Sequence, residues 1–180
     1  MITYNEIICR SLIDFEEIKF VLANNNIELV NSNQVKERYF LKNDISFKNA
    51  SYKKILENSF ILSDINDKKY LSYKSFNEYT KSISKIEVVN EDACIDFLTH
   101  IGYKEAFVLE KNVYQYSDTI HTLNIINLIN IGLYLSVAKE DASSDELKEI
   151  LSSFNIPYDD QDLNVSIEKL VMSKDRRYLR

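Results

Sequence analysis

The residue types that most often do chemistry are few in this chain, and their spacing does not favour the common catalytic sites. His100 and His121 are the two histidines, and neither has a serine or cysteine nucleophile with an acidic partner nearby in sequence. Cys9 and Cys94 are the two cysteines, and no Cys-x-x-Cys or Cys/His spacing accompanies them. The sequence therefore predicts neither a nucleophile–histidine site nor a zinc site.

Glu6 and Glu87 are the carboxylates that stand out by position. They occupy matching places in two stretches that share the predicted order strand, helix, strand, strand. The first stretch begins at residue 2 and the second begins near residue 85. We therefore expect one domain, 1–180, built from two similar halves of about 1–80 and 85–172, with a basic tail at 173–180.

Strand and helix patterns follow one another along both halves. Ser11-x-x-Asp14 predicts the start of a helix, and Gly102 is expected just after the end of another. Asn66-Asp67 predicts the turn of a hairpin. Near the end, Ser143-x-x-Glu146 predicts a helix cap, and a short helix or turn is expected at "SIEKLVM". The total is roughly eight to ten strands and four helices, which must form a layered sheet or a barrel.

The stretch "GLYLSVA" (132–138) predicts a strand with an unusual polar side. Leu133, Leu135 and Val137 alternate with other residues at the period of two that strands require. The alternate positions end in Ser136 and Ala138, which are small and neutral although 28% of the chain is charged.

Composition narrows the classes of function. The net charge is −6 and acidic and basic residues are interspersed, which argues against a nucleic-acid surface. The longest apolar run is interrupted by asparagines and is too short to span a bilayer, and no signal peptide is apparent. Two free thiols fit a reducing compartment, so we expect a cytoplasmic protein without a membrane partner.

The ordered pieces "NEIICRSL", "QVKERYF", "YLSYKS", "IDFLTHIGYKEAFVLEKNVYQY" and "INIGLYLSVAKE" resemble the CYTH superfamily. This superfamily has the triphosphate-tunnel fold and includes class IV adenylyl cyclases, thiamine triphosphatases and inorganic triphosphatases. The resemblance covers about residues 2–172. It implies an α+β fold with an antiparallel eight-stranded β-barrel, two β-α-β-β halves and helices packed outside. Inside such a barrel, basic residues hold a triphosphate and carboxylates hold Mg²⁺ or Mn²⁺.

The resemblance is weakest at the positions where the family has its phosphate-binding and metal-binding residues. The first strand of the family reads Glu-x-Glu-x-Lys, and here only Glu6 matches; Arg10 would face the same way. The family's two metal-binding glutamates on the later strand correspond to Ser136 and Ala138, so we expect both inside the barrel. The expected arginine pair falls in "SFILS", which has no basic residue.

The remaining candidates are cations. The resemblance matches Lys74 to a family lysine, where a phosphate contact, an internal ion pair and a solvated position all stay open. Lys111 matches the first member of a Lys-x-Arg pair whose arginine is missing, or it lies on the surface beside Glu110. Glu6 and Glu87 are either remnants of a metal site or interior acids paired with these cations.

Three functional hypotheses follow. The first is a degenerate, non-catalytic protein that uses the barrel as a binding or interaction scaffold for a small ligand, either of low charge or with one anionic group, with no cofactor. Its ligand-binding candidates are Arg10, Lys74, Lys111, Glu6 and Glu87. The second is an active adenylyl cyclase or triphosphatase with relocated ligands for Mg²⁺ or Mn²⁺, for which Glu37 and Glu140 are further carboxylates. The third is a structural partner or homodimer subunit, since some class IV cyclases dimerise.

Overall fold

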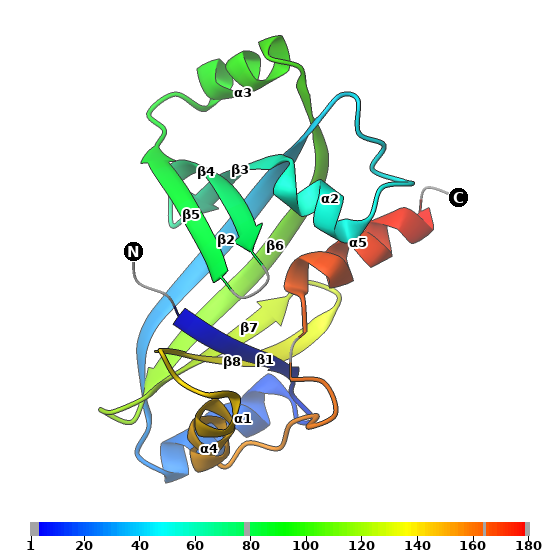
Figure 1. Cartoon of the computed structure of the whole chain (residues 1–180). Helices are drawn as coiled ribbons and strands as arrows, with labels where there is room; N and C mark the ends of the chain where they lie inside the picture. Colours follow the sequence, from blue (N-terminus) through cyan, green and yellow to red (C-terminus); the bar gives the residue numbers. More distant parts are fainter. Residues whose placement is uncertain (1–3, 78–79, 164, 179–180) are drawn as a thin grey trace. The chain divides into compact units, whose positions relative to one another are not determined.

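Eight strands and five helices make up the described chain (Figure 1). The computed structural model describes the backbone of residues 4–77, 80–163 and 165–178, with the side chains of residues 5–73, 85–163 and 165–174. The strands are β1 (Tyr4–Arg10), β2 (Glu28–Lys42), β3 (Ser59–Ile65), β4 (Lys68–Asn77), β5 (Thr80–Glu87), β6 (Tyr103–Ser117), β7 (Thr122–Leu128) and β8 (Gly132–Glu140). The helices are α1 (Phe15–Asn24), α2 (Tyr52–Glu57), α3 (Glu91–His100), α4 (Ser144–Ser153) and α5 (Ile167–Tyr178).

All eight strands belong to one antiparallel sheet with the order β1-β8-β7-β6-β2-β3-β4-β5. The predicted α+β class and the eight antiparallel strands are confirmed. β1 and β5 stand at the two ends of this order, so hydrogen bonds do not close the sheet into a barrel.

The chain divides into two compact units. Unit 1 contains Met1–Asn33 and Lys111–Ser166, and unit 2 contains Gln34–Glu110 and Ile167–Arg180. The long strands β2 and β6 contribute to both units. Each unit therefore combines parts of both predicted sequence halves.

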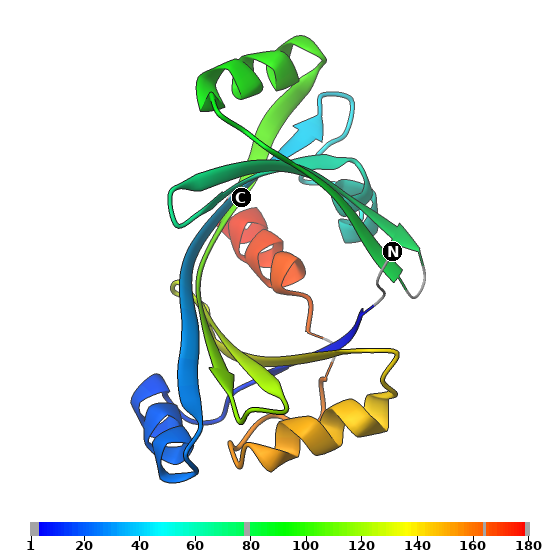
Figure 2. The same cartoon turned by 90° about the vertical axis from the view of Figure 1, so that its left-hand side faces the viewer.

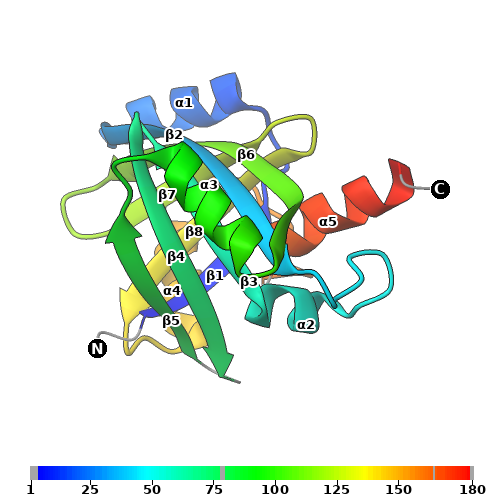
Figure 3. The ribbon, with the colours of Figure 1, turned by 90° about the horizontal axis from the view of Figure 1, so that it is seen from above.

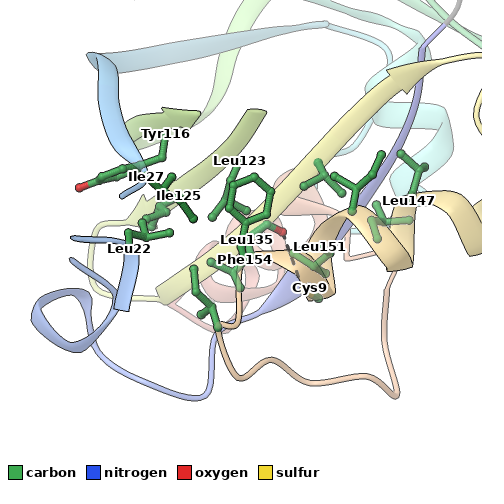
Figure 4. Packing of buried hydrophobic residues seen from close by; sticks show 14 of the residues in the cluster. Cys9, Leu22, Ile27, Tyr116, Leu123, Ile125, Leu135, Leu147, Leu151 and Phe154 are labelled. Atoms are coloured by element: carbon green, nitrogen blue, oxygen red, sulfur yellow. Dashed lines mark hydrogen bonds between the residues drawn. The ribbon is translucent and has the colours of Figure 1, made fainter. Parts of the chain in front are cut away.

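Unit 1 is a sheet with two helices on one side. α1 and α4 lie on the same side of β1, β7 and β8 (Figures 1 and 2). The side chains on that side of the sheet form a buried cluster with both helices (Figure 4), including Cys9, Leu22, Ile125, Leu135, Leu147, Leu151 and Phe154. Burial raises the pKa of the Cys9 thiol to about 12, so this thiol is a packing group and not a nucleophile at neutral pH.

The outer edge of β1 is covered by the segment that follows α4. The N–H of Ile8 donates to the C=O of Leu163, and the N–H of Val165 donates to the C=O of Ile8, at 3.1 and 3.0 Å. The N–H of Asp159 donates to the C=O of Arg10 at 2.9 Å. Residues 157–165 therefore satisfy backbone groups that an end strand otherwise leaves open.

Unit 2 has helices on both sides of its strands. Leu98 of α3 packs on Phe40 and Leu62, which point to one side of β2 and β3. Figures 2 and 3 show α3 over that side of the strands, and Figure 2 shows α5 on the other side. The hydroxyl groups of Tyr52 in α2 and Ser173 in α5 form a hydrogen bond of 2.8 Å, which ties these two helices together.

Local signals locate several boundaries correctly. Ser143 caps α4 by accepting from the N–H of Glu146, and Asn66 and Asp67 have positive φ angles in the β3–β4 turn, as predicted. Gly102, with a φ of +87°, follows α3 as expected. The cap of α1 is Asp14 and not Ser11, because Asp14 and Glu17 form a reciprocal capping box.

Four elements differ from the sequence expectation. β2 and β6 are each one continuous strand where the pattern predicts two, α2 is an additional short helix, and α5 extends through residues expected to be a tail. Among the helices of the described residues, none has the length and apolar character needed to cross a membrane.

Candidate functional site

Glu6 lies beside the two positions where the family resemblance implies metal ligands. In the β1–β8 pairing, Glu6 is directly opposite Ala138, and Ile8 is opposite Ser136. The hydroxyl of Ser136, which is fully buried, donates to Oε1 of Glu6 at 2.5 Å. This contact places Ser136 on the same side of the sheet as Glu6, and the register places Ala138 there too.

This side of unit 1 is called the polar face below; it is the side of β1, β8, β7 and β6 away from α1 and α4. Ser136 is opposite Asn124 in β7, and Asn124 is opposite Gln115 in β6. Directly paired residues of antiparallel strands point to the same side, so these three residues form a row across the polar face. The neighbouring positions Leu135 and Ile125 point the other way, into the buried cluster.

Arg10 begins a second row on the polar face. It is opposite Tyr134, which is opposite Ile126 in β7. Arg10 is exposed, whereas Tyr134 is 5% exposed. Burial raises the pKa of the Tyr134 phenol, and the positive charge of Arg10 acts in the opposite direction. Lys111 is opposite Leu128 at the end of β7, and the register assigns it to the same face.

The other two predicted site residues lie in unit 2. Glu87 is exposed and opposite Tyr70 in the β4–β5 pairing. Nζ of Lys85 lies 3.6 Å from the centre of the Tyr70 ring, so an exposed cation and an acid are neighbours there. The backbone of Lys74 is opposite Ile83, and its side chain lies outside the described residues. Three of the five predicted residues, Glu6, Arg10 and Lys111, are thus placed on one face.

The side of unit 2 away from α3 is called the covered face below. It carries Tyr39, Ile61 and Ser72, which are opposite one another along β2, β3 and β4. Tyr39 is fully buried, stacks on Phe107 at 4.2 Å between ring centres and donates its hydroxyl to Glu37 at 3.2 Å. The charge of Glu168 in α5 acts on Tyr39, so the helix lies near this side of the strand.

β3 supplies no cation to the covered face. Ser59, Ile61 and Ser63, the alternate positions of the stretch where the resemblance implies arginines, are all buried. The Ser59 hydroxyl donates to the C=O of Ile55, and the Ser72 hydroxyl of β4 donates to the C=O of Ile61. The hydroxyl groups of Ser59 and Ser72 are therefore satisfied by the protein itself.

The residues around Glu6 do not fit a divalent metal ion. Mg²⁺ and Mn²⁺ prefer several carboxylate oxygens at one spot. Beside Glu6, Ala138 has no oxygen in its side chain, and Ser136 uses its proton to bond the carboxylate. Within residues 5–73, 85–163 and 165–174, no group of three or more His, Cys, Asp or Glu side chains is placed to hold a metal.

The charged cluster around Arg38 was missed by the sequence reasoning. Lys36–Arg38 belong to β2, which is an interior strand of the sheet. Arg38 donates to Glu91 at 3.0 Å and to Glu105, and Nζ of Lys69 lies 2.8 Å from Asp64 and 3.3 Å from Glu91. A cavity of about 240 Å³ lies beside these residues. Because Glu91 begins α3, the cluster fastens that helix to the strands.

The histidines have structural partners. His121 closes the β6–β7 turn, where its N–H and that of Ile120 donate to Asp118. These backbone donors lower the pKa of Asp118. A ring nitrogen of His100 lies 3.3 Å from the C=O of Asp96 in the last turn of α3.

The fold is shared with solved structures although the sequence is not. No family model and no curated protein matches the chain. A Pyrococcus horikoshii protein is similar with a TM-score of 0.66 and 17% identity, over 95% of this chain and 99% of that one. Two further proteins are described as "putative" adenylate cyclases. The one from Vibrio parahaemolyticus has a TM-score of 0.70 and 13% identity, over 95% of this chain and 98% of that one.

The second of these, from Hippeastrum, is reported with a dominant triphosphatase activity. It has a TM-score of 0.59 and 10% identity, over 97% of this chain and 96% of that one. The chain therefore has the fold of the CYTH superfamily, as the sequence resemblance implies.

Proposed function

We propose that this chain is a non-catalytic protein with the triphosphate-tunnel fold, which uses the polar face of unit 1 to bind a small ligand with little negative charge. The observation that carries the proposal is the contact between Glu6 and Ser136, with Ala138 opposite. The carboxylate retained from the family pattern on this strand is bonded to a serine, and the position directly opposite it holds an alanine; the register places one further acid of β8, Glu140, beyond that alanine on the same face.

The charged residues of the polar face also support a ligand with little negative charge. A triphosphate carries three to four negative charges and needs several cations in place to offset them. In the described part of the polar face, Arg10 and Lys111 are the basic residues, and the register places the acids Glu6 and Glu140 on the same face. This balance suits a ligand with at most one anionic group.

Transition-state stabilisation would also be lost. In enzymes that act on phosphates, each well-placed charged contact is worth about 3 kcal/mol. Losing two such contacts slows a reaction about ten-thousand-fold. The serine positions of β3 and the Ser136–Ala138 pair each replace residues that would make such contacts.

An activity assay tests the proposal. The purified full chain is incubated with ATP, thiamine triphosphate and tripolyphosphate, each with Mg²⁺ or Mn²⁺, and phosphate, pyrophosphate and cyclic AMP are measured. We expect no turnover above the protein-free control, while an active enzyme of this fold assayed in parallel turns over. Turnover near 1 s⁻¹, the low end of ordinary enzyme rates, that is lost in Glu6→Gln would replace this proposal by the metal-dependent alternative.

A further inference from the structure

Tyr134 is a buried polar side chain that has no hydrogen-bond partner among the described residues. It is 5% exposed, and a Cβ placed on Gly132 would lie 3.8 Å from its ring, so the ring covers the glycine next to it on β8. Among the described residues, no atom forms a hydrogen bond with its hydroxyl. A buried hydroxyl without a partner costs free energy, and such groups in native proteins call for an explanation.

Two amides extend this unsatisfied surface. Asn124 and Gln115 are half-buried on the polar face, and their side chains likewise form no hydrogen bond within the described part of the chain. Adjacent strands are about 4.8 Å apart, so Tyr134, Asn124 and Gln115 span roughly 10 Å across three strands. That width matches a molecule of one or two small rings.

The chemistry of these groups selects the kind of ligand. An amide side chain and a phenol each donate and accept hydrogen bonds, and so does an alcohol. A hydroxyl-rich molecule can therefore satisfy all three side chains at once. A polyphosphate offers only acceptors and leaves their acceptor atoms without a donor. Arg10, directly opposite Tyr134, adds one guanidinium for one anionic group.

Resting on the proposed non-catalytic function, we propose that the polar face of unit 1 binds a sugar-like, hydroxyl-rich molecule carrying at most one phosphate or carboxylate. Tyr134, Asn124 and Gln115 bond its hydroxyl groups, and Arg10 bonds the single anionic group.

A titration followed by NMR tests the ligand class. The ¹⁵N-labelled full chain is titrated with ribose, ribose 5-phosphate and tripolyphosphate, and the side-chain amide signals of Asn124 and Gln115 are followed. Ribose 5-phosphate is expected to bind tightest, and ribose about tenfold more weakly because it lacks the charged bond to Arg10. Tripolyphosphate is expected to leave both signals unmoved.

Three variants assign the contacts. Tyr134→Phe should weaken ribose 5-phosphate at least fivefold without lowering the melting temperature of the unliganded protein, since its hydroxyl bonds nothing there. A purely structural hydroxyl would lower that temperature. Arg10→Met should make ribose and ribose 5-phosphate bind equally. Tyr116→Phe is the matched control, because Tyr116 is a buried tyrosine of the same sheet that belongs to the core cluster, and it should change nothing.

The outcomes separate this inference from the proposed function. The inference is overturned if neither ribose nor ribose 5-phosphate moves the two amide signals at millimolar concentration. It is also overturned if tripolyphosphate binds more tightly than ribose 5-phosphate. If the sugars fail and triphosphates are not turned over, the inference is wrong and the non-catalytic proposal stands. Turnover of triphosphates overturns the proposed function whether or not the sugars bind.

Discussion

The polar face of unit 1 and the covered face of unit 2 use polar residues for opposite purposes. On the covered face, Tyr39, Ser59 and Ser72 are buried, and each donates its hydroxyl to a protein oxygen. On the polar face, Ser136 and Ser117 have such partners, whereas the side chains of Tyr134 and Asn124 make no hydrogen bond with another described residue. The difference supports the proposal that the polar face binds a ligand and that the covered face is structural.

The largest expected effect tests the structural role of the covered face. Tyr39→Ala removes a fully buried ring stacked on Phe107, and the free energy of unfolding should fall by about 3 to 5 kcal/mol. Urea unfolding of the variant and the wild type measures this loss. Phe97→Ala, at a position 58% exposed on α3, is the control and should cost less than about 1 kcal/mol. A small loss for Tyr39→Ala would mean that the covered face is not a packed interior.

Substituting one serine on each face tests the comparison between the polar face and the covered face. Ser136→Ala removes a donor to a carboxylate and should lower the free energy of unfolding by about 1 to 2 kcal/mol. Ser72→Ala removes a long bond of 3.4 Å to a backbone oxygen and should cost about 0.5 kcal/mol. Chemical denaturation of both variants gives the comparison. Equal losses would show that the Glu6 contact contributes no more than an ordinary neutral hydrogen bond.

Restoring an acid on the polar face should restore part of a metal site. Ala138→Glu places a second carboxylate directly opposite Glu6, where paired side chains have Cβ atoms about 5 Å apart. Mn²⁺ should then bind at least tenfold more tightly than to the wild type, measured by calorimetry. Ala93→Glu, an exposed position on α3, carries the same added charge and should not change Mn²⁺ binding. Equal affinity in both variants would remove Glu6 from consideration as half of a metal site.

The last effect concerns two of the buried phenols, Tyr39 and Tyr134, at alkaline pH. Burial, with Glu37 and Glu168 nearby, holds the pKa of Tyr39 well above its ordinary value of 10. Above pH 10 the unfolded chain loses this proton and the folded chain keeps it, so the free energy of unfolding falls as pH rises. At pH 11 this loss approaches about 1.4 kcal/mol.

Tyr39→Phe should therefore flatten the decline between pH 10 and 11, measured by urea unfolding at each pH. Tyr134→Phe should flatten it less, because the positive charge of Arg10 opposes the effect of burial at Tyr134. The reverse order would show that Tyr134 and not Tyr39 has the less solvated phenol.

The sequence predicted the parts of the site that depend on strand alternation. Glu6, Ser136 and Ala138 could be assigned to one side because a period of two fixes the side of every residue once the pairing is known. The α+β fold was implied by the resemblance to the CYTH superfamily, while the cap at Ser143 and the glycine that follows α3, Gly102, followed from local chemistry.

What could not be predicted depends on contacts between distant parts of the chain. Nothing near Arg38 in sequence indicates Glu91 or Glu105, which lie 53 and 67 residues away. The sequence also could not predict that the hydroxyl of Tyr134 has no hydrogen-bond partner among the described residues. A hydroxyl can be called unsatisfied only when all the atoms around it are known. The sequence predicts the start of α1 at Ser11, which is wrong. Ser11 and Asp14 are both good N-cap residues, and only the reciprocal contact of Asp14 with Glu17 decides between them.

The position of β1 between late parts of the chain has a consequence for folding. β1 is the first strand of the sequence, yet one of its edges pairs with β8 and the other with residues 157–165. The contact between Glu6 and Ser136 closes a loop of 130 residues. Contacts of such long range slow folding, because the chain entropy is lost before the contacts form. During synthesis β1 therefore stays without its partners until most of the chain has been made, and unit 1 is expected to fold last although it contains the chain's beginning.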